Sequence, residues 1–357
     1  MDFGVSFQSH IQNSWKHAML AEQMGFSNAW FVDTQMLASD VFACMTLAAE
    51  HTSTIRLGTA VAIAGTRIAP VIAHSIATVN QLAPGRVILG MGTGHTAWRA
   101  MGMPPVRLDH FRHTIAVCRG LLRGERVEYQ ERGRTSTVRF FDLEHGYINV
   151  NDPVPIYVAA AAPKALAIAG ELGDGIITIS ILSPHMLQSA LTTATKAREQ
   201  HREQTTGTHA DWPVVTIGVS CVLRPGEALD SPRVIARVGP RIAVALHFAY
   251  EIVKHGKRPP TYMEPFLTPE YQAYLDERWD EIHATHSRFL HPGEEKFITP
   301  EAIKAMSLTG TREEIIAHIE QLEAVGLTQM VISPPWGYVE ESIVEFAQEI
   351  IADYERY

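Results

Sequence analysis

The stretch RVILGMGTGH, residues 86–95, shows the pattern on which the fold assignment depends. An apolar run, residues 87–91, continues directly into Gly92, Thr93 and Gly94. Continuous apolar runs bounded by turn residues are typical of strands that are buried on both faces of a parallel sheet. Glycine lets the backbone come close to whatever lies beside it. The stretch therefore predicts a buried parallel strand whose carboxyl end faces a close neighbour.

Similar strands recur along the chain, each followed by a segment of helical character. The predicted strands are Phe3–Phe7, Asn28–Asp33, Ile55–Ala62, Arg86–Gly92, Pro155–Ala160, Gly175–Ser180, Val214–Leu223 and Thr328–Ser333. Such alternation indicates a parallel sheet with crossover helices. The first helix lacks the G-x-G-x-x-G motif that usually opens a dinucleotide-binding sheet. We therefore expect an α/β fold, a (β/α)8 TIM barrel that forms one domain over residues 1–357.

Two segments interrupt this alternation. Residues 125–152 contain a two-residue period around a Gly-Arg turn, which predicts an inserted hairpin after the fourth strand. Residues 225–300 are polar, aromatic and proline-containing, and they predict a helical and loop insertion after the seventh strand.

Composition and charge exclude several classes of function. The chain has 357 residues, of which 46% are hydrophobic, so it can bury a large core. Its net charge of −9 gives no basic surface for nucleic acid or anionic lipid, so no nucleic-acid or membrane partner is expected. The 3 cysteines are far apart, which supports neither disulfides nor a zinc site. The absence of a secretory signal and of a long apolar run predicts a cytoplasmic protein.

Two turns at predicted strand ends look suited to bind an anion. Chemistry in TIM barrels lies at the carboxyl ends of the strands. There, GMGTGH follows the fourth strand and YVAAAAPK follows the fifth. We expect the N–H groups of Ala160, Ala161 and Ala162 to point out of a helix start, together with the positive end of the helix dipole. Close packing of helix and strand is the other explanation for such small residues.

Other catalytic motifs are missing from these ends. His10 and His95 lie there, but no H-x-H or H-E-x-x-H pattern accompanies them, so no metal is expected. No G-x-S-x-G elbow appears, and Asp33 stands nearly alone, which argues against paired carboxylates and favours a structural role for it. These absences favour an enzyme whose chemistry depends on a bound cofactor.

Several blocks in order resemble the bacterial-luciferase-like flavin and deazaflavin oxidoreductases, especially the branch with methylenetetrahydromethanopterin reductase. The matching blocks are NAWFVD (28–33), IRLGTAV (55–61), TRIAPVIA (66–73), QLAPGRVILGMGTG (81–94), MGMPPVRLDHFRHTIAVCRGLLRGE (101–125), VPIYVAAAAPKALAIAGELGDGIIT (154–178) and SLTGTREEIIAHIEQLEAVGLTQMVISPP (307–335). They span nearly the whole chain, so the resemblance is specific although GMGTGH alone would be weak evidence.

This resemblance implies a TIM barrel that binds reduced FMN or the deazaflavin coenzyme F420 across its strand ends. It implies a cis peptide bond between Ala60 and Val61 and, because relatives commonly pair, a homodimer. It also implies that the 225–300 insertion covers the site, where five of its side chains either line the site or bury the insertion against the barrel: Phe248, Tyr250, Tyr262, Met263 and Phe266. The cofactor-binding residues assigned on this basis are Ala60, Val61, Thr93, Gly94, His95, Thr96, Ala160, Ala161, Ala162 and Thr178.

Two positions depart from the deazaflavin branch. Ser6 stands where its reductases tend to carry Glu, and Thr34 where they tend to carry His. We therefore expect an FMN-dependent monooxygenase that uses reduced FMN from a separate NAD(P)H:flavin reductase, together with O2, to oxygenate a small organic substrate. Its candidate catalytic residues are His95, His10 and Thr34. The alternatives are an F420-dependent reductase or dehydrogenase that transfers hydride, and a non-catalytic flavin-binding relative.

Overall fold

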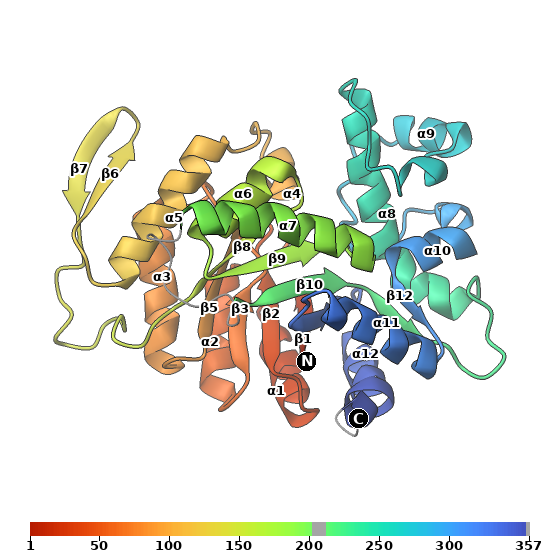
Figure 1. Ribbon diagram of the computed structural model, residues 1–357, viewed down its shortest axis with the longest axis horizontal. Helices are drawn as coiled ribbons and strands as arrows, with labels where there is room; N and C mark the ends of the chain where they lie inside the picture. Colours follow the sequence, from red (N-terminus) through yellow and green to blue (C-terminus); the bar gives the residue numbers. More distant parts are fainter. Residues whose placement is uncertain (202–211, 355–357) are drawn as a thin grey trace.

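The predicted strands form a closed parallel barrel in the computed structural model, which describes residues 1–201 and 212–354 (Figure 1). The barrel strands are β1 (Asp2–Gln8), β2 (Asn28–Val32), β3 (Arg56–Thr59), β4 (Ala62–Ile63), β5 (Val87–Gly92), β8 (Ile156–Ala159), β9 (Gly175–Ile179), β10 (Val214–Gly218) and β13 (Gln329–Ile332). They pair in the order β3-β2-β1-β13-β10-β9-β8-β5, and the pairing of β3 with β5 closes the ring. β4 continues the third strand position beside β5. The expected TIM barrel is confirmed.

Helices follow the strands and surround the barrel. They are α1 (Ser14–Gln23), α2 (Val41–His51), α3 (Ala69–Leu82), α4 (His95–Ala100), α5 (Leu108–Leu122), α6 (Pro163–Leu172), α7 (Pro184–Gln200), α11 (Arg312–Ala324), α12 (Val339–Phe346), a π-helical turn (Ala347–Ile351) and α13 (Ala352–Tyr354). Local signals begin some of them. Thr311 and Glu314 form the predicted capping box of α11, and the Asp40 side chain accepts from the Ala43 N–H at the start of α2.

The two insertions lie at opposite ends of the molecule in Figure 1. The hairpin consists of β6 (Val127–Glu131) and β7 (Arg134–Val138), paired antiparallel. The second insertion holds α8 (Pro232–Lys254), α9 (Pro269–Asp276), α10 (Pro300–Met306) and 3-10 turns at Glu264–Phe266 and Glu295–Phe297. Its apolar side chains form a core of their own, separate from the core between barrel and helices. Both insertions therefore have the predicted character.

The seventh strand differs from its prediction. Instead of one strand over Val214–Leu223, β10 ends at Gly218 and the chain leaves the barrel. β11 (Ser220–Val222) then pairs with β12 (Leu308–Gly310), the strand that follows the insertion. The Val219 carbonyl accepts from the Leu308 N–H at 2.8 Å. The apolar run is thus shared between two sheets, and the small sheet joins the two ends of the insertion.

Trp30 fills the middle of the barrel, and its side chain is fully buried. Gly4 and Gly58 flank it on the neighbouring strands. A Cβ atom at Gly58 would lie 2.4 Å from the indole ring, and one at Gly4 would lie 3.1 Å from the indole nitrogen. The side chains around Trp30 are Ile88, Tyr157, Ile177, Val215, Ile217 and Val331. The interior is therefore a packed core, and ligands can approach only from its ends.

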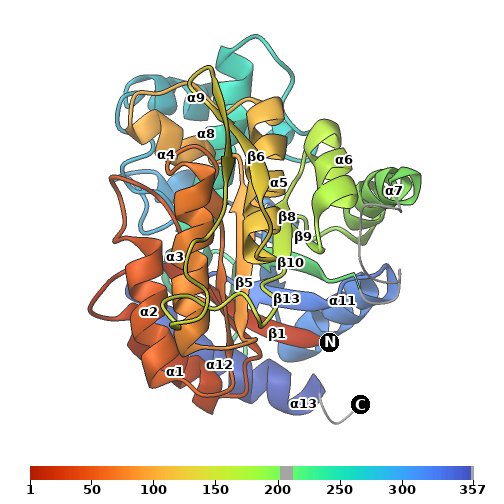
Figure 2. The same ribbon diagram turned by 90° about the vertical axis from the view of Figure 1, so that its left-hand side faces the viewer.

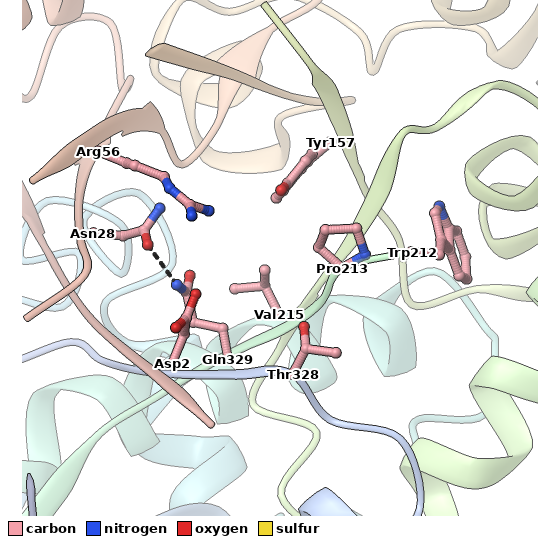
Figure 3. Close-up of a pocket in the computed structure, with 9 residues that line it drawn as sticks. All are labelled: Asp2, Asn28, Arg56, Tyr157, Trp212, Pro213, Val215, Thr328 and Gln329. Carbon is pink, nitrogen blue, oxygen red and sulfur yellow. Dashed lines mark hydrogen bonds between the residues drawn. The ribbon is translucent and has the colours of Figure 1, made fainter. Parts of the chain in front are cut away.

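A small cavity of about 190 Å³ lies at the amino end of the barrel, and Figure 3 shows its lining residues. Asn28 accepts a hydrogen bond from Gln329 Nε2 at 2.7 Å, and Gln329 Oε1 accepts from Trp30 Nε1 at 3.0 Å. These bonds hold the indole in place from the amino end of the barrel. In TIM barrels this end serves stability, whereas ligands bind at the opposite end.

The substitution Gly58→Ala tests the packing around Trp30. We expect it to lower the free energy of unfolding by about 1–3 kcal/mol, because the added methyl group overlaps the indole ring. Urea unfolding of both proteins measures the difference. Ser136→Ala, on the exposed strand β7, is the control and should stay within about 0.5 kcal/mol of the original chain. Equal stability of all three proteins would contradict the tight packing.

Candidate active site

Small side chains form the floor of the barrel mouth at the carboxyl ends of the strands. Ser6, Ala60, Gly92 and Ala159 face inward there, following the two-residue period of their strands. Gly92 is closely surrounded, because a Cβ atom there would lie 2.5 Å from Val61 Cγ2 and 3.5 Å from the Cβ of Ala159. Larger side chains at these positions would fill the mouth. The sequence thus leaves room for a flat group above the core.

The peptide bond between Ala60 and Val61 is cis, as the resemblance implies. The residues before it are fixed by two hydrogen bonds. The Ala60 N–H donates to the Phe31 carbonyl at 2.7 Å, and the Thr59 hydroxyl donates to the Gly90 carbonyl at 2.7 Å. Val61 is only partly buried, so its side chain borders the mouth.

Asp33, which follows β2, supports the residues just beyond this bond. Its Oδ2 accepts from the Ile63 N–H at 3.3 Å and pairs with Arg67 Nη1 at 2.8 Å. Its Oδ1 accepts from Gln35 Nε2 at 2.7 Å. Arg67 also pairs with Asp40 at 2.5 Å. Asp33 is 3% exposed and both its oxygens are engaged, which agrees with the structural role predicted for it.

The turn Thr93–Thr96 lies at the edge of the mouth between β5 and α4. Gly94 has a φ of 63°, and a Cβ atom there would lie 2.3 Å from Ile63 Cγ2, so the position requires glycine. Trp98 Nε1 donates to the Thr93 carbonyl at 2.9 Å and holds the turn in place. The two threonine side chains of the turn are half-buried, and their hydroxyls can bind ligand oxygens.

The alanine turn after β8 differs in one respect from its prediction. The Ala160 N–H donates to the Ile177 carbonyl at 3.0 Å, so it belongs to the barrel and cannot bind an anion. Ala161–Ala162 are exposed, and Pro163 begins α6 without an N–H. The free N–H groups in the first turn beyond this proline belong to Lys164–Ala165. Ala160 is thus lost from the predicted anion seat, whereas no hydrogen bond among the described residues engages the N–H groups of Ala161 and Ala162.

Thr178 does not face the barrel mouth, in contrast to the cofactor contact predicted for it. It is fully buried in β9 between Ile177, which faces the barrel interior, and Ile179, so its own side chain faces outward. Its hydroxyl donates to the Val215 carbonyl at 3.2 Å and lies 2.9 Å from the Thr216 hydroxyl. Ile179 is 42% exposed and is the residue of β9 that can contact a ligand.

A cavity of about 500 Å³ opens on the side of the mouth formed by the residues after β1, β2 and β13. Its lining residues are Gln8, Ser9, His10, Met36, Leu37, Ala38, Ser39, Arg288, Phe289 and Trp336. The His10 ring lies 4.9 Å from that of Trp336, and His10 Nδ1 has no hydrogen-bond partner among the described residues. Half of these side chains are apolar and half are polar, so the cavity can contact both kinds of group on a small molecule.

The two positions that depart from the deazaflavin branch, Ser6 and Thr34, are both buried. The Thr34 carbonyl accepts from the N–H groups of Leu37 and Ala38, so Thr34 shapes the loop beneath the cavity. Thr34 is not among the residues that line the cavity, in contrast to the catalytic position predicted for it.

His95, the first residue of α4, contacts the second insertion. Its Nε2 lies 2.9 Å from Oε2 of Glu251 in α8, and its ring meets that of Phe248 edge-on with centroids 5.1 Å apart. Phe248 therefore lies beside a candidate site residue, in agreement with the expectation that it lines the site. The remaining aromatic and Met candidates pack within the insertion's own core: Tyr250, Tyr262, Met263 and Phe266.

Glu251 is the main site residue that the sequence analysis missed. It is 2% exposed and contacts Arg99 Nη1 at 2.5 Å and His283 Nε2 at 2.5 Å besides His95. Burial would raise the pKa of Glu251, but the contacts with His283 and His95 outweigh it and lower the pKa to about 2. One signal was available, because Phe248 and Glu251 are three residues apart and share a helix face.

A family model described as luciferase-like monooxygenase matches residues 3–329. The chain belongs to the luciferase-like monooxygenase family. A 5,10-methylenetetrahydromethanopterin reductase of Methanolobus tindarius is 29% identical over 364 residues, which cover 98% of this chain and 100% of the relative. An F420-dependent glucose-6-phosphate dehydrogenase of Intrasporangium calvum is 30% identical over 281 residues, 74% of this chain and 79% of the relative. The coenzyme F420-dependent tetrahydromethanopterin reductase of Methanopyrus kandleri superposes with a TM-score of 0.69 at 21% identity, over 99% of both chains.

These family members correct the expected activity. The prediction of an FMN-dependent monooxygenase is wrong, because the similar proteins are reductases and dehydrogenases, and F420 appears in the names of two of them. The prediction rested on Ser6 and Thr34. His10 and His95 lie near the same strand ends but come from other elements. FMN, O2 and a separate flavin reductase were expected only for that activity. Membership of the family and oxidoreductase activity are confirmed.

Two negative findings apply to residues 1–201 and 212–354. No helix there is long and apolar enough to cross a membrane. No group of three or more His, Cys, Asp or Glu side chains there is arranged to hold a metal ion.

The substitution Asp33→Ala tests the support of the cis turn. We expect a loss of about 2–3 kcal/mol in the free energy of unfolding, because the Ile63 N–H loses its acceptor and Arg67 keeps only Asp40. Urea unfolding measures it. Asp40→Ala removes the exposed partner and a helix cap and should cost about 1 kcal/mol. A smaller loss for Asp33→Ala than for Asp40→Ala would contradict the assigned role.

Proposed function

We propose that this protein is an F420-dependent oxidoreductase, a reductase or dehydrogenase that transfers hydride between the deazaflavin and a small organic substrate. The observation that carries the proposal is the division of the barrel mouth. A floor of small side chains at Ala60, Gly92 and Ala159 lies between turns suited to an anion and a cavity lined by both apolar and polar side chains. The similarity to F420-dependent family members supports it.

The residues at the mouth fit a deazaflavin. A flat ring system can lie on the floor, where even one methyl group on Gly92 would collide with Val61. Ile179 adds an exposed apolar contact. The phosphate-bearing side chain of the cofactor can reach the threonines of the Thr93–Thr96 turn and the first turn of α6, where Lys164 adds positive charge. When bound, F420 supplies or accepts a hydride, which is chemistry that no protein side chain offers.

This chain's own residues would bind the substrate and handle its proton. The cavity beside the floor includes Met36, Phe289 and Trp336, which expose 77%, 52% and 41% of their surface and can contact an apolar substrate. His10 lines the same cavity. His95 begins α4 beside the Thr93–Thr96 turn, and its side chain is one-third exposed. An imidazole can donate or accept a proton, so both histidines are candidates for exchanging a proton with the substrate.

Binding titrations test the proposal. We expect the purified protein to bind F420 at least tenfold more tightly than FMN, a difference of about 1.4 kcal/mol in binding free energy. Ala159→Leu should weaken F420 binding at least tenfold by filling the floor, with an unchanged unfolding midpoint. Ser189→Ala, on the exposed side of α7, is the control. Tight FMN binding with no affinity for F420 would overturn the proposal.

The proposal includes a homodimer. Ile68, Val71 and Leu82 on and beside α3 are 41%, 43% and 44% exposed, an apolar surface that a second copy of the chain can cover. We expect light scattering to give the mass of two chains, and Val71→Glu to shift it towards one by placing charge in the contact. Phe141→Ser, which changes another exposed apolar residue, should leave the mass unchanged. A single-chain mass for the unmodified protein would rule the dimer out.

A further inference from the structure

A buried carboxylate joins the second insertion to the turn at the mouth. Glu251 projects from α8, and its oxygens contact His95 and Arg99 from the two ends of α4. His283, from the segment after α9, contacts the same carboxylate. Figure 2 shows α4 and α8 together at the upper edge of the barrel. One nearly inaccessible carboxylate therefore faces one permanent cation and two imidazoles.

The geometry assigns different roles to the two nitrogens of His95. Nε2 lies 2.9 Å from Oε2 of Glu251, an ion-pair contact, so this nitrogen faces the carboxylate. Nδ1 is then the ring nitrogen of His95 that can meet a ligand. In the doubly protonated ring Nδ1 is a hydrogen donor. The His95 side chain is one-third exposed.

We propose that Glu251 is a positioning residue for His95. Glu251 orients the imidazole so that Nδ1 of His95 carries the proton that it exchanges with the substrate. The inference rests on the proposed function and deepens it. When hydride is added to a carbonyl carbon, the carbonyl oxygen must gain a proton, and Nδ1 of His95 gives it. In the reverse direction Nδ1 takes the hydroxyl proton as hydride leaves the carbon.

Charged groups around His95 set the direction of the pH effect. Glu251 places a negative charge beside the ring, while Arg99 on α4 and His283, when protonated, place positive charge there. Phe248 contributes no charge. Since the loss of a neighbouring negative charge disfavours a protonated group, we expect Glu251→Gln to move the alkaline fall of the reduction rate to lower pH.

Glu251→Gln tests this role through three measurements. The first is the ¹⁵N spectrum of the cofactor-free protein, with the His95 signal identified by its loss in His95→Gln. We expect the neutral imidazole of the original chain to carry its hydrogen on Nε2. In Glu251→Gln we expect this preference for Nε2 over Nδ1 to be lost. The second is the F420 dissociation constant, which should change less than threefold. The third is kcat for reduction, which should fall roughly ten- to hundredfold with the alkaline limb shifted.

Further variants separate positioning from folding. Glu251→Asp should recover part of kcat, and Glu251→Gln combined with His95→Gln should lose no more activity than His95→Gln alone, because the two act as a unit. Glu294→Gln is the matched control, since it breaks the other buried carboxylate–imidazole pair of the insertion, His247–Glu294. It should lower stability without moving the pH profile.

The outcomes distinguish this inference from the proposed function. If the unmodified protein fails to bind F420, the proposed function fails, while the ¹⁵N measurement still decides the Glu251–His95 pair. If F420 binds and Glu251→Gln weakens that binding without changing kcat or its pH profile, His95 holds the cofactor and the inference is overturned. An unchanged His95 spectrum in Glu251→Gln overturns it as well.

Discussion

Trp30 in the middle of the barrel is the constraint on which the rest of the structure depends. Its indole occupies the space that inward side chains at Gly4 and Gly58 would otherwise need. Gln329 binds the indole nitrogen from below and closes the amino end with polar contacts. A barrel filled in this way admits a ligand only above the indole. The small side chains of the mouth are therefore where a flat group can lie, and the packing that stabilises the barrel also defines the floor of the site.

The second insertion connects the two sides of this floor. It supplies Phe289 and Arg288 to the cavity beside the floor and Glu251 to the opposite edge beside the Thr93–Thr96 turn. Glu251 balances the charge of Arg99, so each protonated imidazole near it leaves a net positive charge at that edge. The second insertion thus contributes side chains to both sides of the floor, and Glu251 is the one that contacts the turn-side helix α4.

The sequence predicted most of the fold because its signals are local. The strand positions, the hairpin and the capping box at Thr311 each depend on a few neighbouring residues. The predictions failed where contacts between residues far apart in the sequence determine the local structure. The seventh strand stops at Gly218 because Ser220–Val222 pair with residues 308–310 across the insertion. The Ala160 N–H is unavailable because Ile177, on the next strand, accepts it. Thr178 faces outward by strand parity, which could have been read from Ile177 and Ile179.

The error about the cofactor has the same origin. Ser6 and Thr34 lack the groups of the deazaflavin branch when positions are compared one by one, but chemistry depends on which atoms reach the mouth, whichever strand they come from. The fold brings His95 there from the fourth turn and His10 from the first. Glu251, about 150 residues further along the chain than His95, supplies a carboxylate that contacts one of these imidazoles. The candidate proton-handling groups of this chain thus come from the first and fourth turns of the barrel, and their absence from positions 6 and 34 says little about the cofactor.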